Sequence, residues 1–216
     1  MNLISFSSSL SLVAILELLG TFAFAISGIR LASGKQMDWF GAYVIGLVTA
    51  VGGGTTRDLL LDVTPFWIDD PQYLITTGIA LLVVLLFKER LFKLGKTIFL
   101  FDTIGLGLFT VSGISKCLML GSPVWVCIVL GTITGSVGGV IRDIIINEVP
   151  LLFRKDIYAL SCILGGLVFF GCTLVPFLTD YQEILAIGVI IMIRVLAAKF
   201  HLQLPRLLLE EKERVE

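Results

Sequence analysis

The 216-residue sequence has few charged residues and almost no histidine. Charged residues make up 15% of it, and its single histidine, His201, lies near the C-terminus. A Ser-His-Asp or Cys-His catalytic set needs a histidine beside its partners, so no such set can be assembled in the rest of the chain. With 16 basic and 17 acidic residues and no basic stripe, nothing supports a nucleic-acid-binding surface. The sequence predicts a protein that is not an enzyme and has no metal or cofactor.

Cysteine is also scarce. The four cysteines include no Cys-x-x-Cys pair, and each lies in or beside an apolar stretch: Cys117, Cys127, Cys162 and Cys172. Without a second type of ligand nearby, they do not form the ligand set of a zinc site. We expect them to pack as small apolar side chains, as free cysteines usually do.

Hydrophobic residues are abundant. They make up 56% of the chain, and the mean hydropathy is +1.00, which lies outside the range of a soluble globular domain. Segments of about twenty apolar residues, enough to cross a hydrocarbon core of roughly 30 Å, follow one another along the sequence. They fall near residues 10–29, 38–62, 72–88, 97–116, 122–147, 156–175 and 183–200. The sequence predicts an all-α integral membrane protein with seven transmembrane helices in a lipid bilayer.

The chain contains an internal duplication with an offset of 85 residues. Residues 51–58, with the sequence VGGGTTRD, return as SVGGVIRD at residues 136–143. The same offset aligns further pairs, among them Glu17 with Asp102, Gly20 with Gly105, Phe24 with Phe109, Ser27 with Ser112 and Tyr73 with Tyr158. A long ungapped register is typical of a duplicated structural unit. We predict three-helix repeats in residues 1–95 and 96–180, followed by a seventh helix and a C-terminal tail in residues 181–216.

Basic residues predict the orientation of the spans, because Lys and Arg are retained mainly on the cytoplasmic side. They follow the first, third, fifth and seventh spans, whereas Lys116 is the one basic residue of the opposite loops. The basic residues after those four spans are Arg30 and Lys35; Lys88, Arg90, Lys93 and Lys96; Arg154 and Lys155; and Lys199, Arg206, Lys212 and Arg214. This pattern predicts an external N-terminus and a cytoplasmic C-terminus.

The number of spans in each repeat predicts how the two repeats are related. Three is an odd number, so the second repeat enters the membrane from the side opposite to the first. The two copies then form an inverted repeat, an arrangement that encloses a pathway at the interface between the halves. The seventh helix lies outside the duplication, and we expect it to serve in packing or oligomerisation.

Glycines interrupt the second and fifth spans at equivalent positions. The second span contains Gly52, Gly53 and Gly54, and the fifth contains Gly138 and Gly139. Each glycine is about 1 kcal/mol less favourable in a helix than alanine, so a kink or partial unwinding is one prediction. Small residues in membrane helices also let two backbones approach closely. The sequence leaves both interpretations open.

Two arginines lie inside these spans. Arg57 precedes Pro65 by eight residues and Arg142 precedes Pro150 by the same interval, which places each arginine about 12 Å inside its span at 1.5 Å per residue. A charge at that depth costs at least a few kcal/mol unless it is paired or hydrated. Each arginine therefore needs a nearby carboxylate or water.

The carboxylates available to the arginines are of two kinds. Asp58 and Asp143 come next in the chain, and adjacent helical residues point about 100° apart, so we expect them to be poor partners. Glu17 and Asp102 lie at comparable depths in the first and fourth spans. We predict that these two residues pair with the arginines of their own repeats or share a hydrated cavity with them.

Intramembrane charges are candidates for a transport pathway, although paired charges can also simply fix helix register. Their position beside glycine-weakened helices favours a polar path through each protomer. Cations on this path would interact with carboxylates and freed carbonyl groups, whereas anionic or zwitterionic substrates would use the arginines. The candidate pore charges are Glu17, Arg57, Asp58, Asp102, Arg142 and Asp143.

The doubled motif resembles the prokaryotic members of the trimeric intracellular cation (TRIC) channel family. The resemblance covers residues 10–200 and rests on the seven spans, the inverted repeat and the segments GGGTTRD and GGVIRD, each followed by proline. It implies a homotrimer in the prokaryotic inner membrane, with one pore per protomer for potassium and other monovalent cations. It also implies that the kinked second and fifth helices line this pore. The motif is similar, too, to that of bacterial membrane proteins called glycine transporters, so a secondary transporter of a small zwitterion such as glycine is the alternative.

Overall fold

The structure, a computed structural model, describes residues 3–87, 91, 96–153 and 157–202, with side chains described from residue 12 onward. These ranges contain seven α-helices, two short 3-10 helices and no strand. The α-helices are α1 (Leu3–Ser33), α2 (Trp39–Leu60), α3 (Gln72–Leu86), α5 (Thr97–Met119), α6 (Val124–Ile145), α7 (Ala159–Thr173) and α8 (Gln182–Phe200). The 3-10 helices are η1 (Leu151–Phe153) and η2 (Pro176–Tyr181). The predicted all-α fold with seven helices is confirmed.

Several helices have the length or the apolar surface that a membrane requires. Three described helical segments are long and apolar enough to cross one: Leu12–Ser33, Thr97–Met119 and Val124–Ile145. Helices α3 and α7 are apolar but have 15 residues each, about 22 Å at 1.5 Å per residue. Large apolar side chains also cover the outside of the bundle, including Leu82, Leu86, Trp125, Leu167 and Ile184. All four cysteines are free and buried, as expected for apolar packing.

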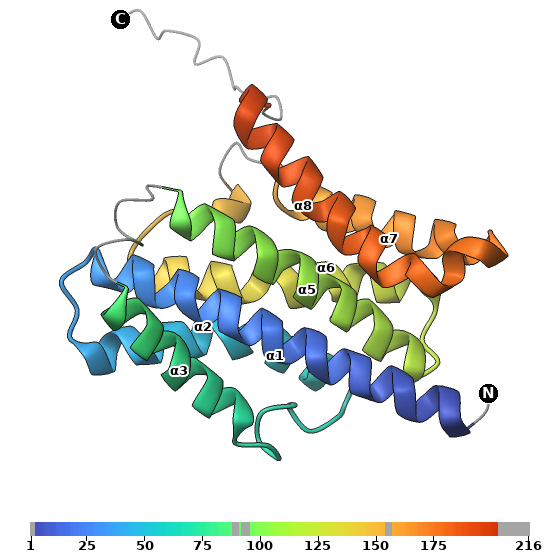
Figure 1. The fold of residues 1–216 in the computed structure, drawn as a ribbon, viewed down its shortest axis with the longest axis horizontal. Helices are drawn as coiled ribbons and strands as arrows, with labels where there is room; N and C mark the ends of the chain where they lie inside the picture. Colours follow the sequence, from blue (N-terminus) through green and yellow to red (C-terminus); the bar gives the residue numbers. More distant parts are fainter. Residues whose placement is uncertain (1–2, 88–90, 92–95, 154–156, 203–216) are drawn as a thin grey trace, which may run out of the picture.

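The two repeats pack through equivalent helices, α1 against α5 and α2 against α6. Their contacts occur in exchanged pairs: Gly20 faces the ring of Phe109, and Gly105 faces the ring of Phe24. Adding 85 to one member and subtracting it from the other converts the first contact into the second. The two rings stack on each other with centroids 5.4 Å apart. Figure 1 shows that α1 and α5 run in opposite directions, as do α2 and α6, which is the predicted inverted arrangement.

Part of the predicted topology falls on residues that are not described. The C-terminal tail from residue 203 onward lies outside the described residues, and so do several basic residues used for the orientation: Lys88, Arg90, Lys93, Arg154, Lys155, Arg206, Lys212 and Arg214. The orientation of the termini and the boundaries of the repeats stay predictions.

Helices α2 and α6 are continuous through their glycines, so of the predicted kink or partial unwinding the unwinding is wrong and the kink stays a prediction. The glycines lie where the two helices cross. A Cβ atom on Gly53 would lie less than 3.0 Å from the carbonyl oxygen of Thr134, and one on Gly138 would lie equally close to that of Thr49. The structure therefore supports close backbone packing, and the contact offsets the low helix propensity of glycine.

The remaining glycines of the motif face side chains. A Cβ atom on Gly52 would meet Ile141 at 3.1 Å. One on Gly54 would collide with the ring of Phe66, whereas one on its counterpart Gly139 would lie 3.0 Å from the hydroxyl of Tyr158. The glycines thus make room for neighbours that come from outside their own helix.

Candidate functional site

Two clusters of buried ionic side chains lie in the bundle, one for each repeat. The first cluster consists of Glu17 on α1, Arg57 and Asp58 on α2, and Lys116 on α5. The second cluster consists of Asp102 on α5, Arg142 and Asp143 on α6, and Arg194 on α8. The six members predicted from the sequence have side chains that are 4% exposed or less. Each cluster contains two carboxylates and two cations, so its formal charges sum to zero.

The structure confirms the two predicted ion pairs. Arg57 Nη2 lies 2.8 Å from Glu17 Oε1, and Arg142 Nη1 lies 2.8 Å from Asp102 Oδ1. A guanidinium buried alone would cost several kcal/mol, and a carboxylate in direct contact offsets much of this cost. The duplication has therefore preserved the same pairing of buried charges in both repeats.

The prediction that each arginine would avoid the neighbouring aspartate is wrong. Arg57 Nε and Nη2 lie 2.8 Å and 2.7 Å from Asp58 Oδ1. In the second cluster, Arg142 Nε lies 2.8 Å from Asp143 Oδ1. The angle between adjacent helical residues describes their Cβ directions, but the long arginine side chain bends back over its own helix. Each guanidinium consequently contacts two carboxylates.

The turns at the ends of α2 and α6 direct the following segments back toward the clusters. Both helices are followed by a left-handed residue, Asp62 with φ 55° and Asn147 with φ 58°. In both, the next amide donates to the carbonyl oxygen five residues earlier, at 3.0 Å and 2.8 Å. This is the Schellman pattern of helix termination, and Asp and Asn tolerate its left-handed position better than most residues.

This turn fixes the aspartates of both clusters. The backbone N–H of Phe66 donates to Asp58 Oδ2 at 2.9 Å, and the N–H of Leu151 donates to Asp143 Oδ2 at 2.9 Å. One oxygen of each carboxylate therefore faces its arginine while the other accepts a backbone hydrogen bond. Such charge-assisted hydrogen bonds are stronger than neutral ones and hold the aspartates in a single orientation.

Each cluster also contains or contacts a side chain from the opposite repeat. Lys116 of α5 places its Nζ atom 2.8 Å from Asp58 Oδ1 in the first cluster. Arg142 Nη1 of the second cluster donates to Ser27 Oγ of α1 at 2.8 Å. The polar groups therefore bridge the interface between the repeats, where an inverted-repeat protein would have its pathway.

Sequence reasoning missed the cations Lys116 and Arg194. The sequence pattern predicts Lys116 in a loop, but it lies in the last turn of α5 with its side chain 23% exposed. Arg194 lies outside the duplicated motif, and its side chain is 2% exposed with Nη2 3.5 Å from Asp102 Oδ2. A signal for Arg194 was present, because it lies in the middle of an apolar span and intramembrane charges are functional candidates.

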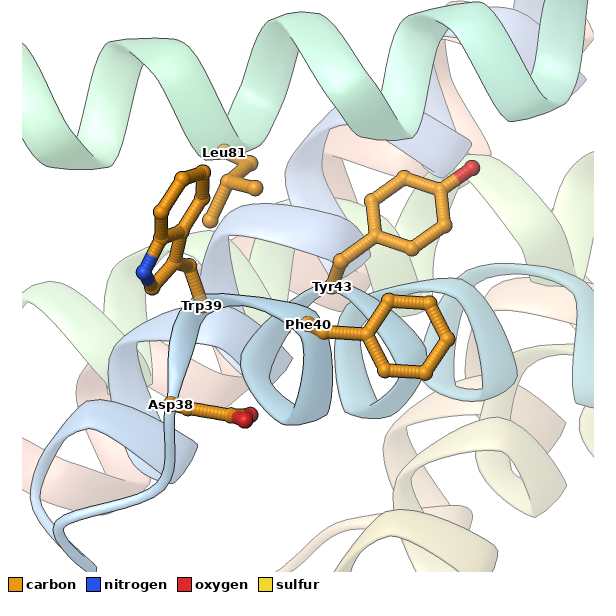
Figure 2. A pocket seen from close by; sticks show the side chains of 5 residues that line it. All are labelled: Asp38, Trp39, Phe40, Tyr43 and Leu81. Atoms are coloured by element: carbon orange, nitrogen blue, oxygen red, sulfur yellow. The ribbon is translucent and has the colours of Figure 1, made fainter.

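A groove on the outside of the bundle lies apart from both clusters. It is lined by Asp38, Trp39, Phe40, Tyr43 and Leu81. Figure 2 shows Trp39 beside Leu81 of α3, with Phe40 directed away from that helix. Trp39 and Phe40 are 75% and 74% exposed, which fits aromatic residues that anchor a helix at the membrane interface.

The chain is similar to bacterial membrane proteins over most of its length. A family model described as "Glycine transporter" matches residues 14–89 and 99–173. The "UPF0126 inner membrane protein YadS" of Escherichia coli (strain K12) is 38% identical over 207 residues, which cover 94% of this chain and 100% of that protein. A "UPF0126 membrane protein" of Deinococcus radiodurans is 41% identical, with 77% of this chain and 78% of that protein covered.

The fold is similar to solved channel structures. The structure described in "Structural basis for conductance through TRIC cation channels" has a TM-score of 0.80 and 36% identity, covering 91% of this chain and 98% of that one. The TRIC trimeric intracellular cation channel orthologue from Rhodobacter sphaeroides has a TM-score of 0.82 and 29% identity, covering 88% and 98%. The residues matched by the family model fall in both repeats and include the six cluster members predicted from the sequence.

Proposed function

The chain belongs to the TRIC family of membrane proteins, and on this premise we propose that it is a cation channel of a prokaryotic inner membrane. The observation that carries this proposal is the similarity to TRIC cation channel structures over 91% and 88% of the chain, with TM-scores of 0.80 and 0.82. A channel makes and breaks no covalent bond, which agrees with the prediction that the chain is not an enzyme.

The finer features of the proposed channel are its ion, its assembly and its path. We propose that it conducts potassium and other monovalent cations and that it assembles as a homotrimer with one pore in each protomer. Helices α2 and α6 would line this pore, and the two clusters would lie beside it. The N-terminus would be external and the C-terminus cytoplasmic, as the basic residues predict.

A path between α2 and α6 would be closed at their crossing. The space between Gly53 and the carbonyl group of Thr134 is too small for a methyl group, and the same holds for Gly138 and Thr49. An ion needs more room than this, so conduction requires the two helices to move apart there. Glycine permits this movement because no side chains interlock across the contact.

The clusters would supply the electrostatic environment of the open path. Their four carboxylates can attract cations, while Arg57 and Arg142 hold these carboxylates in fixed positions. Because the carboxylates already have partners, they would bind a passing ion weakly. Weak binding is what a channel needs, since an ion must leave as readily as it enters.

The test is to reconstitute the purified protein in planar bilayers with potassium salts on both sides. We expect unitary current steps, because an open channel passes many ions during one open period. A carrier needs at least one protein movement per substrate on the microsecond-to-millisecond timescale, and its flux shows no such steps. Absence of potassium currents from folded protein that has inserted into the bilayer would contradict the channel function.

A second candidate is a carrier of a small zwitterion such as glycine. The matching family model is described as a glycine transporter. In addition, neighbouring carboxylates and guanidinium groups offer partners for an ammonium and a carboxylate, and inverted repeats are common in carriers. Saturable glycine uptake with counterflow, without unitary currents, would support this function in place of the channel.

A further inference from the structure

The two clusters differ in the group that reaches the second oxygen of one carboxylate. In the first cluster, the hydroxyl of Tyr73 donates to Glu17 Oε2 at 3.3 Å. In the second, Arg194 Nη2 lies 3.5 Å from Asp102 Oδ2. Tyr158 is the counterpart of Tyr73, and its hydroxyl has no hydrogen-bond partner among the described residues. Arg194 thus contacts the second carboxylate oxygen of Asp102, in the way that the Tyr73 hydroxyl contacts that of Glu17.

Two aromatic rings hold Arg194 in this place. The carbon of its guanidinium lies 4.5 Å from the centroid of the Tyr158 ring and 5.0 Å from that of Phe99. A cation over an aromatic face is attracted by the ring quadrupole, and the attraction is larger where water is excluded. Tyr158 therefore supports the arginine with its ring, while its hydroxyl makes no hydrogen bond to Asp102.

The duplicated residues alone leave both clusters negative. Each repeat supplies two carboxylates and one arginine, which sum to a formal charge of −1. Lys116 and Arg194 bring the clusters to zero, but they differ in their contact with solvent. The Lys116 side chain is 23% exposed and the Arg194 side chain is 2% exposed. Water screens the lysine in part, whereas the arginine acts on its surroundings at low dielectric.

We propose that Arg194 is a selectivity-determining residue, a positive charge from the helix outside the duplication that holds the second cluster neutral and limits its attraction for cations. This inference rests on the proposed channel function. Without the arginine charge, the second cluster would carry −1 in a poorly hydrated environment. The field of that charge would raise the local concentration of cations and lower that of anions.

The test compares the potassium-to-chloride permeability ratio of variants in planar bilayers under a potassium chloride gradient. We expect R194Q to raise the ratio about tenfold, the lower end of the effect that focused charge has on local ion concentration. R194K keeps the charge and should keep the wild-type ratio. The matched control is K199Q, which removes a charge from the end of the same helix and should also leave the ratio unchanged.

A second comparison, which removes the Asp102 charge alone or together with the Arg194 charge, covers the case in which the single variant R194Q does not fold. D102N leaves the second cluster with a formal charge of +1 and should lower the ratio, whereas D102N combined with R194Q restores neutrality and should return the ratio to the wild-type value. Equal ratios for D102N and the double variant would overturn the inference, as would an unchanged or lower ratio for folded R194Q. If the wild-type protein conducts and the variants give these results, only the role of Arg194 is contradicted. If the wild-type protein passes no current, both the channel function and this inference are contradicted.

Discussion

Replacing Gly53 by alanine tests the contact between α2 and α6. In an unobstructed helix, alanine is about 1 kcal/mol more favourable than glycine. At this position the new Cβ atom would lie less than 3.0 Å from the carbonyl oxygen of Thr134, a backbone atom that cannot rotate away. Overpacking costs roughly 1–3 kcal/mol, and a contact with rigid backbone belongs to the upper part of this range. After the gain of about 1 kcal/mol from alanine is subtracted, we expect G53A to lower the free energy of unfolding by about 1–2 kcal/mol.

The assay is thermal or denaturant unfolding of the purified variants in one detergent. G78A is the matched control, because a Cβ atom on Gly78 of α3 would meet nothing within 4 Å. We expect G78A to be as stable as the wild-type protein or to gain up to about 1 kcal/mol. G138A should resemble G53A because the offset of 85 residues converts the contact of Gly53 with Thr134 into that of Gly138 with Thr49.

The double variant adds a further check. Once one methyl group has separated the helices, the second meets less resistance, so G53A with G138A should cost less than the sum of the single substitutions. If G53A were as stable as G78A, Gly53 of α2 would not be in close contact with the carbonyl group of Thr134 of α6. Strict additivity would contradict the view that both glycines belong to one crossing.

Three smaller predictions concern single contacts, each measured as a change in the free energy of unfolding. E17Q should cost roughly 3 kcal/mol, the lower end for a broken buried pair because Asp58 still contacts the arginine, and a cost under about 1 kcal/mol would contradict the burial of this pair. K35Q removes an exposed pair with Glu148 and should cost less than about 1 kcal/mol; a larger loss would mean that the pair locks the two loops. N147G should be nearly neutral and N147V should cost about 1–2 kcal/mol, because valine resists the left-handed conformation; equal stability of the two variants would refute this.

The duplication made much of the architecture predictable. The apolar segments predict the helices, because a helix that crosses a membrane requires a long run of hydrophobic residues. The constant offset aligns Glu17 with Asp102 and Arg57 with Arg142. An ion pair between Glu17 and Arg57 therefore implies an ion pair between Asp102 and Arg142. Both pairs are present at 2.8 Å. Where a buried arginine is present in both copies of a segment, its partner must also be present in both copies, so the sequence leaves few candidates for that partner.

The contacts made by long side chains were not predictable in the same way. The interaction of Arg57 with Asp58 depends on how the arginine bends, which the directions of the Cβ atoms do not determine. The positions of Lys116 and Arg194 depend on how α5 and α8 are rotated and packed. Neither residue has a charged counterpart at the offset of 85, so the duplication gave no indication of its partner.

The glycines show where local propensity and tertiary packing conflict. Helix propensity predicts a weak point at Gly52 to Gly54, yet α2 is continuous there. The decisive contact is the backbone of Thr134, which lies more than eighty residues away in the sequence. A preference of about 1 kcal/mol per residue cannot decide the local structure when a helix crossing depends on the absence of side chains.

The differences between the repeats have a common physical origin. An exact inverted duplication would give both clusters the same charges, and each would keep a formal charge of −1. A buried net charge is costly, so each cluster needs an additional cation. The two repeats obtain it differently: Lys116 approaches Asp58 from the end of α5, and Arg194 approaches Asp102 from α8. Because one of these cations is partly exposed and the other is buried, the two clusters differ electrostatically even though the helices that carry them are related by the inverted repeat.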